Sequence, residues 1–131
     1  MVKLLKKLSR TLRIPYHRAR AFRRLQEYHS RPRSLEETVQ WAMHFGSSGF
    51  FTVRTLQIPS KITALARAAA ALKPRIILEI GTARGGTALI WSSLAGARVI
   101  TCDLQDMRLQ KELFESFPPP RLEVHGNLAV G

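Results

Sequence analysis

The feature that most constrains the fold is a strand, a glycine turn, a helix and a second strand that follow one another in residues 75–104. Residues 76–80, IILEI, are apolar and rich in β-branched side chains, which is typical of a strand buried on both faces. The turn at residues 81–86, GTARGG, offers glycines that accept a positive φ and lack a Cβ. A helix is then predicted for residues 87–94 and a second buried strand for residues 97–102.

This order of elements predicts the α/β class, with a Rossmann-like doubly wound parallel sheet preceded by a helical N-terminal region. Ligands of such sheets bind outside the carboxyl ends of the strands, where Asp103 follows the second strand. The dinucleotide fingerprint G-x-G-x-x-G/A is met only loosely by Gly81, Ala83 and Gly86. Alanine replaces the middle glycine, which in that fingerprint lets a pyrophosphate approach the backbone.

A second motif starts two residues earlier. Residues 79–85, EIGTARG, resemble the E/D-x-G-x-G-x-G motif of class I S-adenosylmethionine-dependent methyltransferases, and Asp103 stands where that family has its second acidic residue. The segments LEIGTARGGT and VITCDL are most similar to a bacterial branch that includes sugar O-methyltransferases and the cephalosporin-hydroxylase group. The resemblance extends over residues 56–125 and is most specific in residues 77–103.

The resemblance implies that S-adenosylmethionine is the cofactor. Its binding residues would be Glu79, Gly81, Thr82, Ala83, Gly85, Asp103 and Asn127. Glu79 would help to hold the methionine amino group, and Asp103 would accept hydrogen bonds from both ribose hydroxyls. Asn127 replaces the aspartate that the family commonly has near the adenine amino group, and an amide can still accept that hydrogen bond.

The charge of the ligand also favours this cofactor, because a carboxylate at Glu79 suits a cationic ligand and would repel a pyrophosphate. The alternative for Glu79 is a strand-end acid that caps nearby backbone N–H groups. Asp103 does not distinguish the two cofactors, since an acid at this place also binds the ribose of NAD.

The helices and strands before and after this unit follow from local signals. Ser34 and Glu37 form an S-x-x-E capping box that opens one helix, and Ser60 is predicted to cap the next. A further helix is expected at residues 106–117, and a third strand at residues 121–125. By the right-handed crossover rule the three strands should lie in the order 3-2-1.

A class I methyltransferase sheet has seven strands, so we expect a sheet truncated after its third strand that carries only the cofactor half-site. The resemblance places the acceptor pocket and any general base in the other half, and no catalytic residue is assigned. The free edge of the first strand could pair with a second copy in a homo-oligomer.

The basic charge is concentrated in residues 1–33, which hold 11 of the 21 Lys and Arg residues but only one of the nine acidic residues. Leucines at positions 4, 5, 8 and 12 recur at helical spacing among the basic residues, and Pro15 is predicted to end this helix. Such a helix is typical of binding to an anionic membrane surface. The alternative is a solvated helix that packs on the domain. Residues 16–33 contain no recognised nucleic-acid module, which disfavours a nucleic-acid partner.

We therefore divide the chain into a basic amphipathic arm at residues 1–33, a helical lead-in and cofactor-lid segment at residues 34–74, and a partial S-adenosylmethionine-binding domain at residues 75–131. In the resembling family a lid lies where residues 56–62, LQIPSKI, stand, and Gln57 is a candidate to line the pocket. No metal site is expected, because His17 and His29 lack partners at ligand spacing. No apolar run is long enough to span a membrane.

The single cysteine, Cys102, is interpreted as a small buried hydrophobe and indicates a reduced, cytoplasmic location, with the arm peripheral at the membrane. The leading hypothesis is a methyltransferase that acts on a hydroxyl group of a small molecule or sugar. One alternative is a fragment of an NAD(P)-binding Rossmann oxidoreductase. The other is a non-enzymatic basic protein that binds membrane or RNA surfaces through the arm.

Overall fold

The computed structural model describes residues 1–45, 53–116 and 122–126. Within these ranges five helices and three strands follow one another. In chain order they are α1 (Val2–His29), α2 (Leu35–His44), α3 (Pro59–Ala71), β1 (Ile76–Ile80), α4 (Gly86–Ser92), β2 (Arg98–Cys102), α5 (Arg108–Glu115) and β3 (Leu122–His125).

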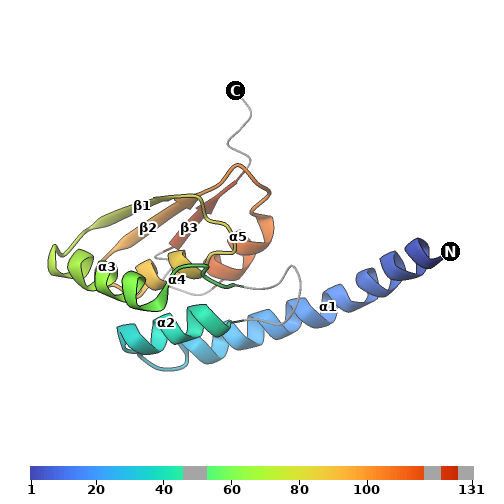
Figure 1. The fold of residues 1–131 in the computed structure, drawn as a ribbon, viewed down its shortest axis with the longest axis horizontal. Helices are drawn as coiled ribbons and strands as arrows, with labels where there is room; N and C mark the ends of the chain where they lie inside the picture. Colours follow the sequence, from blue (N-terminus) through green and yellow to red (C-terminus); the bar gives the residue numbers. More distant parts are fainter. Residues whose placement is uncertain (46–52, 117–121, 127–131) are drawn as a thin grey trace.

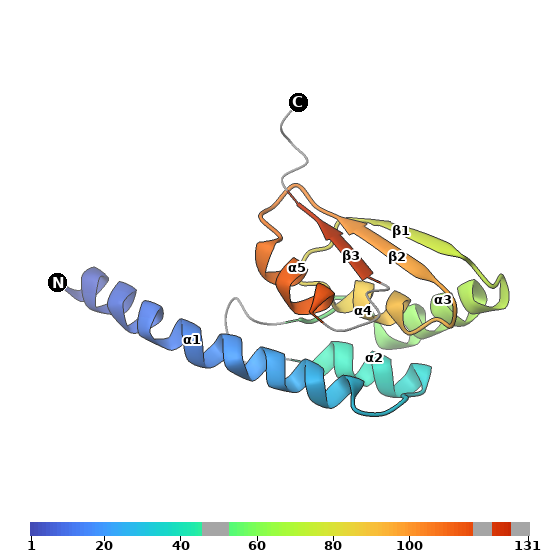
Figure 2. The ribbon, with the colours of Figure 1, turned by 180° about the vertical axis from the view of Figure 1, so that it is seen from behind.

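The three described strands form one parallel sheet in the order β1-β2-β3, with β2 in the middle. Ile76 pairs with Arg98 and Ile80 with Cys102, while Cys102 pairs with His125. The helices lie on one side of this sheet in both views (Figures 1 and 2). The predicted α/β class, the parallel pairing and the strand order are confirmed.

The described helices cover one face of the sheet. Val99, Thr101 and Val124 point to the covered face and are almost fully buried. On the opposite face the three apolar residues of β1, which are Ile76, Leu78 and Ile80, are 61%, 62% and 83% exposed. The prediction that residues 76–80 form a strand buried on both faces is therefore wrong, because side chains alternate between the faces and the described helices pack on only one of them. Cys102, also expected to be buried, is only partly so.

Helix α1 is one continuous helix from Val2 to His29, with Pro15 inside it. The prediction that Pro15 ends the helix is wrong. Proline removes one backbone hydrogen bond at a cost of about 3 kcal/mol or more, but it does not forbid helical φ. The helix continues because its second half is fixed by packing, where Ala21, Leu25 and Tyr28 are buried in the main hydrophobic cluster with residues of α4 and α5.

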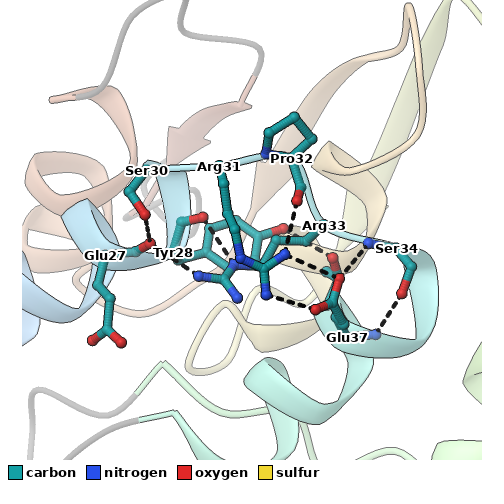
Figure 3. Close-up of polar contacts among 9 residues, drawn as sticks. Glu27, Tyr28, Ser30, Arg31, Pro32, Arg33, Ser34 and Glu37 are labelled. Atoms are coloured by element: carbon teal, nitrogen blue, oxygen red, sulfur yellow. Dashed lines mark hydrogen bonds and ion pairs between the residues drawn. The ribbon is translucent and has the colours of Figure 1, made fainter.

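Arginines fix the connection between α1 and α2, as Figure 3 shows. The Arg33 guanidinium donates hydrogen bonds to the carbonyl oxygens of Glu27 and Tyr28, each at 3.1 Å, and so satisfies the last turn of α1. It also lies 4.8 Å from the ring centroid of Trp41 in α2. Nearer the N-terminus, Arg18 of α1 forms an ion pair with Glu112 of α5. Arg18 and Arg33, two basic residues of the predicted arm, therefore bind the body of the protein. The boundary of the arm at residue 33 stays a prediction.

The capping box at the start of α2 is confirmed. The backbone N–H of Glu37 donates to Ser34 Oγ at 3.1 Å, and the N–H of Ser34 donates to Glu37 Oε2 at 2.9 Å. A hydrogen bond from Arg31 and that from the Ser34 backbone lower the pKa of Glu37 to about 2. The predicted cap at Ser60 is wrong, because α3 begins at Pro59 and its N-cap residue is Ile58. Proline suits the first helical position, where its missing N–H would have had no partner.

We expect Ser34→Ala to lower the free energy of unfolding by about 1 kcal/mol, because the N–H of Glu37 loses its acceptor. Urea denaturation followed by circular dichroism measures this change. Ser60→Ala is the matched control, since Ser60 lies inside α3 and caps nothing, and its effect should be well below that of Ser34→Ala. Equal losses in the two variants would contradict the assignment of the cap.

Candidate functional site

A cleft of about 590 Å³ lies next to the glycine turn, at the carboxyl ends of β1 and β2. The turn itself, the loop after β2, helix α5 and the segment before α3 each contribute to its wall. The lining residues are Leu56, Ala83, Arg84, Gln105, Asp106, Met107, Leu109 and Gln110. This is the edge of a parallel α/β sheet where ligands are expected.

The turn brings its backbone N–H groups to this edge through left-handed conformations. Gly81, Ala83 and Gly85 have φ values of 96°, 48° and 90°. The N–H of Gly81 donates to the Cys102 carbonyl at 2.7 Å, and the N–H of Gly85 donates to the Thr82 carbonyl at 2.8 Å. An alanine with positive φ is uncommon and costs about 1–2 kcal/mol, so the surrounding contacts must hold Ala83 in place.

Two glycines of the turn are needed for packing inside the protein. A Cβ on Gly85 would lie 2.5 Å from Cε2 of Phe114, and a Cβ on Gly86 would overlap the backbone of Arg54 and Thr55. Both glycines are buried. Gly85 was predicted to bind the cofactor, and its observed neighbour is the Phe114 ring of α5. Gly86 allows the segment before α3 to cross directly over the start of α4.

Asp103 holds the turn from the neighbouring strand. Its Oδ2 accepts the N–H of Ala83 at 2.9 Å, and its Oδ1 accepts the N–H of Gln105 at 3.1 Å. The backbone N–H of Ala83, aided by those of Gln105 and Leu104, lowers the pKa of Asp103. The side chain is therefore a carboxylate at neutral pH. Since it is only partly buried, it keeps lone pairs free for a ligand beside Ala83.

Glu79 lies on the covered face of β1, beneath the helices. Thr101 Oγ donates to its Oε1 at 2.7 Å, and Trp91 Nε1–H donates to its Oε2 at 3.1 Å. Thr82 Oγ lies 2.7 Å from Thr101 Oγ, so a chain of hydroxyl groups links this carboxylate to the glycine turn. Burial raises the pKa of Glu79, although the hydrogen bonds from Thr101 and Trp91 oppose that shift.

Beyond the hydrogen bond within the turn from Gly85 to Thr82, the described residues connect the predicted site residues at two further places. Ala83 contacts Asp103 directly, and Thr82 is connected to Glu79 through Thr101. Asn127 lies outside the described residues. The alternative in which Glu79 caps backbone N–H groups is not what the described contacts show, because its partners are the Thr101 and Trp91 side chains.

Sequence reasoning missed part of the cleft and the partners of Glu79. Gln57 was the candidate from the lid segment, but its neighbour Leu56 lines the cleft. The Gln57 side chain is exposed, and its N–H donates to Thr55 Oγ at 3.1 Å. Thr101 could have been found from the strand register, since it pairs directly with Glu79. No signal in the sequence identifies Trp91 as a partner of Glu79.

Two kinds of feature are absent from the part of the chain that the structure describes. No group of three or more His, Cys, Asp or Glu side chains there is arranged to hold a metal ion. No helix there combines the length and the apolar character needed to cross a membrane.

One comparison with known proteins gives a match. The model of the family described as Rhamnosyl O-methyltransferase/CmcI matches residues 41–124, which is more than half of the chain. The matched region includes Glu79, the glycine turn, Asp103 and all the lining residues of the cleft. Comparisons with curated proteins and with solved structures gave no significant match.

Proposed function

The chain belongs to the rhamnosyl O-methyltransferase/CmcI family, and from that premise we propose that it binds S-adenosylmethionine in the cleft beside the glycine turn. The reaction would be methyl transfer to a hydroxyl group of a small molecule or sugar. The observation that carries this proposal is the hydrogen bond by which Ala83, a residue that lines the cleft, holds the Asp103 carboxylate beside it.

The chemistry of the side chains fits this cofactor. S-adenosylmethionine carries a ribose diol, a sulfonium and an ammonium group, and it has no phosphate. The Asp103 carboxylate can accept hydrogen bonds from two neighbouring hydroxyl groups, which are the donors that a ribose offers. Leu56, Met107 and Leu109 supply apolar walls to the same cleft, as an adenine ring requires.

Glu79 supports the proposal through charge. Its carboxylate is partly buried, which disfavours the ionised form and raises the pKa. A cationic ligand nearby would favour the ionised form and lower that pKa, whereas a pyrophosphate would raise it further. The hydroxyls of Thr101 and Thr82 hold the carboxyl group in one orientation behind the turn.

The bound cofactor would supply a methyl group activated by the sulfonium. The residues of this chain would act on the donor side of the reaction. Asp103 would orient the ribose, the turn would fix the position of the donor, and the apolar walls would exclude water from it. Orientation of the donor is a large part of catalysis in such a transfer, because it removes the entropy cost of bringing the reacting atoms into line.

Isothermal titration with S-adenosylhomocysteine tests the proposal. We expect saturable binding, and we expect Asp103→Asn to weaken the affinity by roughly tenfold or more, because each charge-assisted hydrogen bond to the ribose loses strength. Glu112→Gln is the matched control. It removes one negative charge from α5 outside the cleft, where Glu112 pairs with Arg18, and it should leave the affinity unchanged.

Titration with NADH separates the methyltransferase proposal from the oxidoreductase alternative. The folded chain should bind S-adenosylhomocysteine and give no heat with NADH. The opposite result, in a sample whose circular dichroism shows the helices intact, would refute the proposed cofactor.

A further inference from the structure

We propose that the first half of α1, residues 1–16, is a docking surface for the anionic surface of a lipid membrane. The surface consists of an apolar stripe, here called the leucine stripe, and a basic face on the other side of the helix. The leucine stripe comprises Met1, Leu4, Leu5, Leu8 and Leu12. The inference is independent of the proposed methyltransferase function.

The leucine stripe is exposed along its whole length. Leu4, Leu5, Leu8 and Leu12 are 62%, 58%, 52% and 79% exposed. At about 100° of rotation per residue, the five side chains of the stripe occupy an arc of about 100° on one side of the helix. Tyr16 borders this arc one turn after Leu12 and is 63% exposed. Tyrosine favours the boundary between lipid and water, because its ring is apolar and its hydroxyl is polar.

The basic residues occupy the opposite arc. Lys3, Lys6, Lys7 and Arg13 all fall on the side away from the leucine stripe, and residues 1–16 contain no acidic residue. A helix of this kind lies in the membrane interface with its apolar side among the acyl chains. Long basic side chains can then extend toward the lipid head groups. Anionic lipids fit because they complement both the apolar stripe and the uncompensated positive charge.

Within the described residues, the leucine stripe stays exposed while the second half of the helix is attached to the body. Arg18 pairs with Glu112, and Ala21 and Leu25 are buried. The N-terminal part of α1, coloured dark blue, extends away from the sheet and the other helices in both views (Figures 1 and 2). Because the helix passes through Pro15 without ending, the stripe is attached to the folded body by continuous helix. A membrane-bound stripe would therefore restrict the orientation of the whole molecule.

A second copy of the chain is the competing occupant of the stripe. Pairing through the stripe would place two basic helices side by side with no acidic residue in residues 1–16 to offset their charge, and like charges repel one another. The stripe also covers fewer than two heptads, which is short for a coiled coil. Charge and length both favour the membrane.

Co-sedimentation of the full chain with lipid vesicles tests the inference. We expect binding to vesicles made of equal parts phosphatidylcholine and phosphatidylglycerol, and little binding to vesicles of phosphatidylcholine alone. Leu8→Ser combined with Leu12→Ser should weaken the partition by roughly tenfold or more, because two leucines no longer enter the apolar phase. Lys3→Gln combined with Lys7→Gln should weaken it by about fivefold per lysine and reduce its dependence on salt.

Ile14→Ser is the matched control, because Ile14 lies in the same helix but on the basic side, away from the stripe. It changes a β-branched apolar residue to serine and should leave the partition within about twofold of the parent. Circular dichroism verifies that each variant keeps its helices.

Four results would overturn the inference. They are absence of binding to the anionic vesicles, equal binding to neutral vesicles, equal losses in Ile14→Ser and the leucine variant, or a dimer in light scattering that the leucine variant abolishes. The last result would assign the stripe to a second copy of the chain.

Discussion

Replacing Gly86 with alanine is expected to destabilise the protein by about 3 kcal/mol or more. The added Cβ would lie within 3.0 Å of three backbone atoms of Arg54 and Thr55. Overpacking that side chains can relieve costs about 1–3 kcal/mol, and an overlap with the backbone cannot be relieved by changing a rotamer.

The segment that would have to move is held by two hydrogen bonds of Thr55. The N–H of Thr55 donates to the carbonyl of Ala42 at 2.8 Å, and Thr55 Oγ lies 2.8 Å from Thr87 Oγ. A shift of this segment away from α4 would break both interactions and disturb Leu56 in the wall of the cleft. We therefore expect the Gly86→Ala variant to lose cofactor affinity together with stability.

Urea denaturation measures the loss, with Gly96→Ala as the matched control. Gly96 has a φ of 76°, but a Cβ there would meet no atom within 4 Å. Its substitution should cost only the strain of a left-handed alanine, about 1–2 kcal/mol. If Gly86→Ala were no more destabilising than Gly96→Ala, the close approach of residues 54–55 to α4 would be refuted.

Replacing Glu79 with glutamine is expected to keep the fold and weaken binding of S-adenosylmethionine by at least about tenfold, because a negative charge near a cationic ligand is removed. The amide can replace the carboxylate in its contacts. Its oxygen can accept the N–H of Trp91, and its NH₂ group can donate to Thr101 Oγ. Isothermal titration with S-adenosylmethionine and with S-adenosylhomocysteine measures the effect. The loss should be larger for S-adenosylmethionine, since only that ligand carries the sulfonium charge.

We also expect Glu79→Gln to change how the stability of the protein depends on pH. Burial raises the pKa of Glu79 above its ordinary value of 4.5, so the folded state binds this proton more tightly than the unfolded state does. The contribution of Glu79 to stability is fully present below the unfolded pKa and is lost as the pH rises through the higher folded pKa. Glu79→Gln has no such loss, and its stability relative to the parent should therefore increase between pH 4 and pH 7.

Glu123→Gln is the matched control for these measurements. Glu123 is a residue of β3, and the hydrogen bond from Arg98 lowers the pKa of its carboxyl group. It lies on the face of the sheet that the described helices leave uncovered. It should leave both affinities unchanged and should not gain relative stability as the pH rises. Equal affinities of the parent and Glu79→Gln for S-adenosylmethionine would show that the charge of Glu79 does not act on the ligand.

Local patterns were sufficient for those parts of the molecule that depend on neighbouring residues. The strand at residues 76–80 and the turn after it were predictable because β-branched residues favour an extended backbone and glycines permit the positive φ that the turn requires. The capping box was predictable because both partners lie within four residues of one another. The alternation of side chains along β1 implied two faces, but it did not reveal that helices would cover only one of them.

Pro15 illustrates the limit of a local rule. Proline usually ends a helix because it removes a backbone hydrogen bond and clashes with the preceding turn. The local sequence predicts this free-energy cost and nothing that could offset it. The continuation of α1 depends on the burial of Ala21, Leu25 and Tyr28 against segments more than 15 residues away. The Ser60 cap failed for a smaller reason, since Pro59 one residue earlier is equally suited to begin a helix.

The amino-acid order by itself determined the parallel β-α-β unit, the acid two residues before the first glycine, the acid after the second strand and the separation of basic from apolar residues in the first sixteen positions. Each of these is a property of adjacent residues or of a fixed period. The tertiary structure alone decided that Trp91 binds Glu79, that residues 54–55 touch Gly86, and that the leucine stripe remains exposed. Such contacts, and the surfaces that they leave exposed, involve segments that are distant in the chain. Their free energies therefore depend on how the whole core packs.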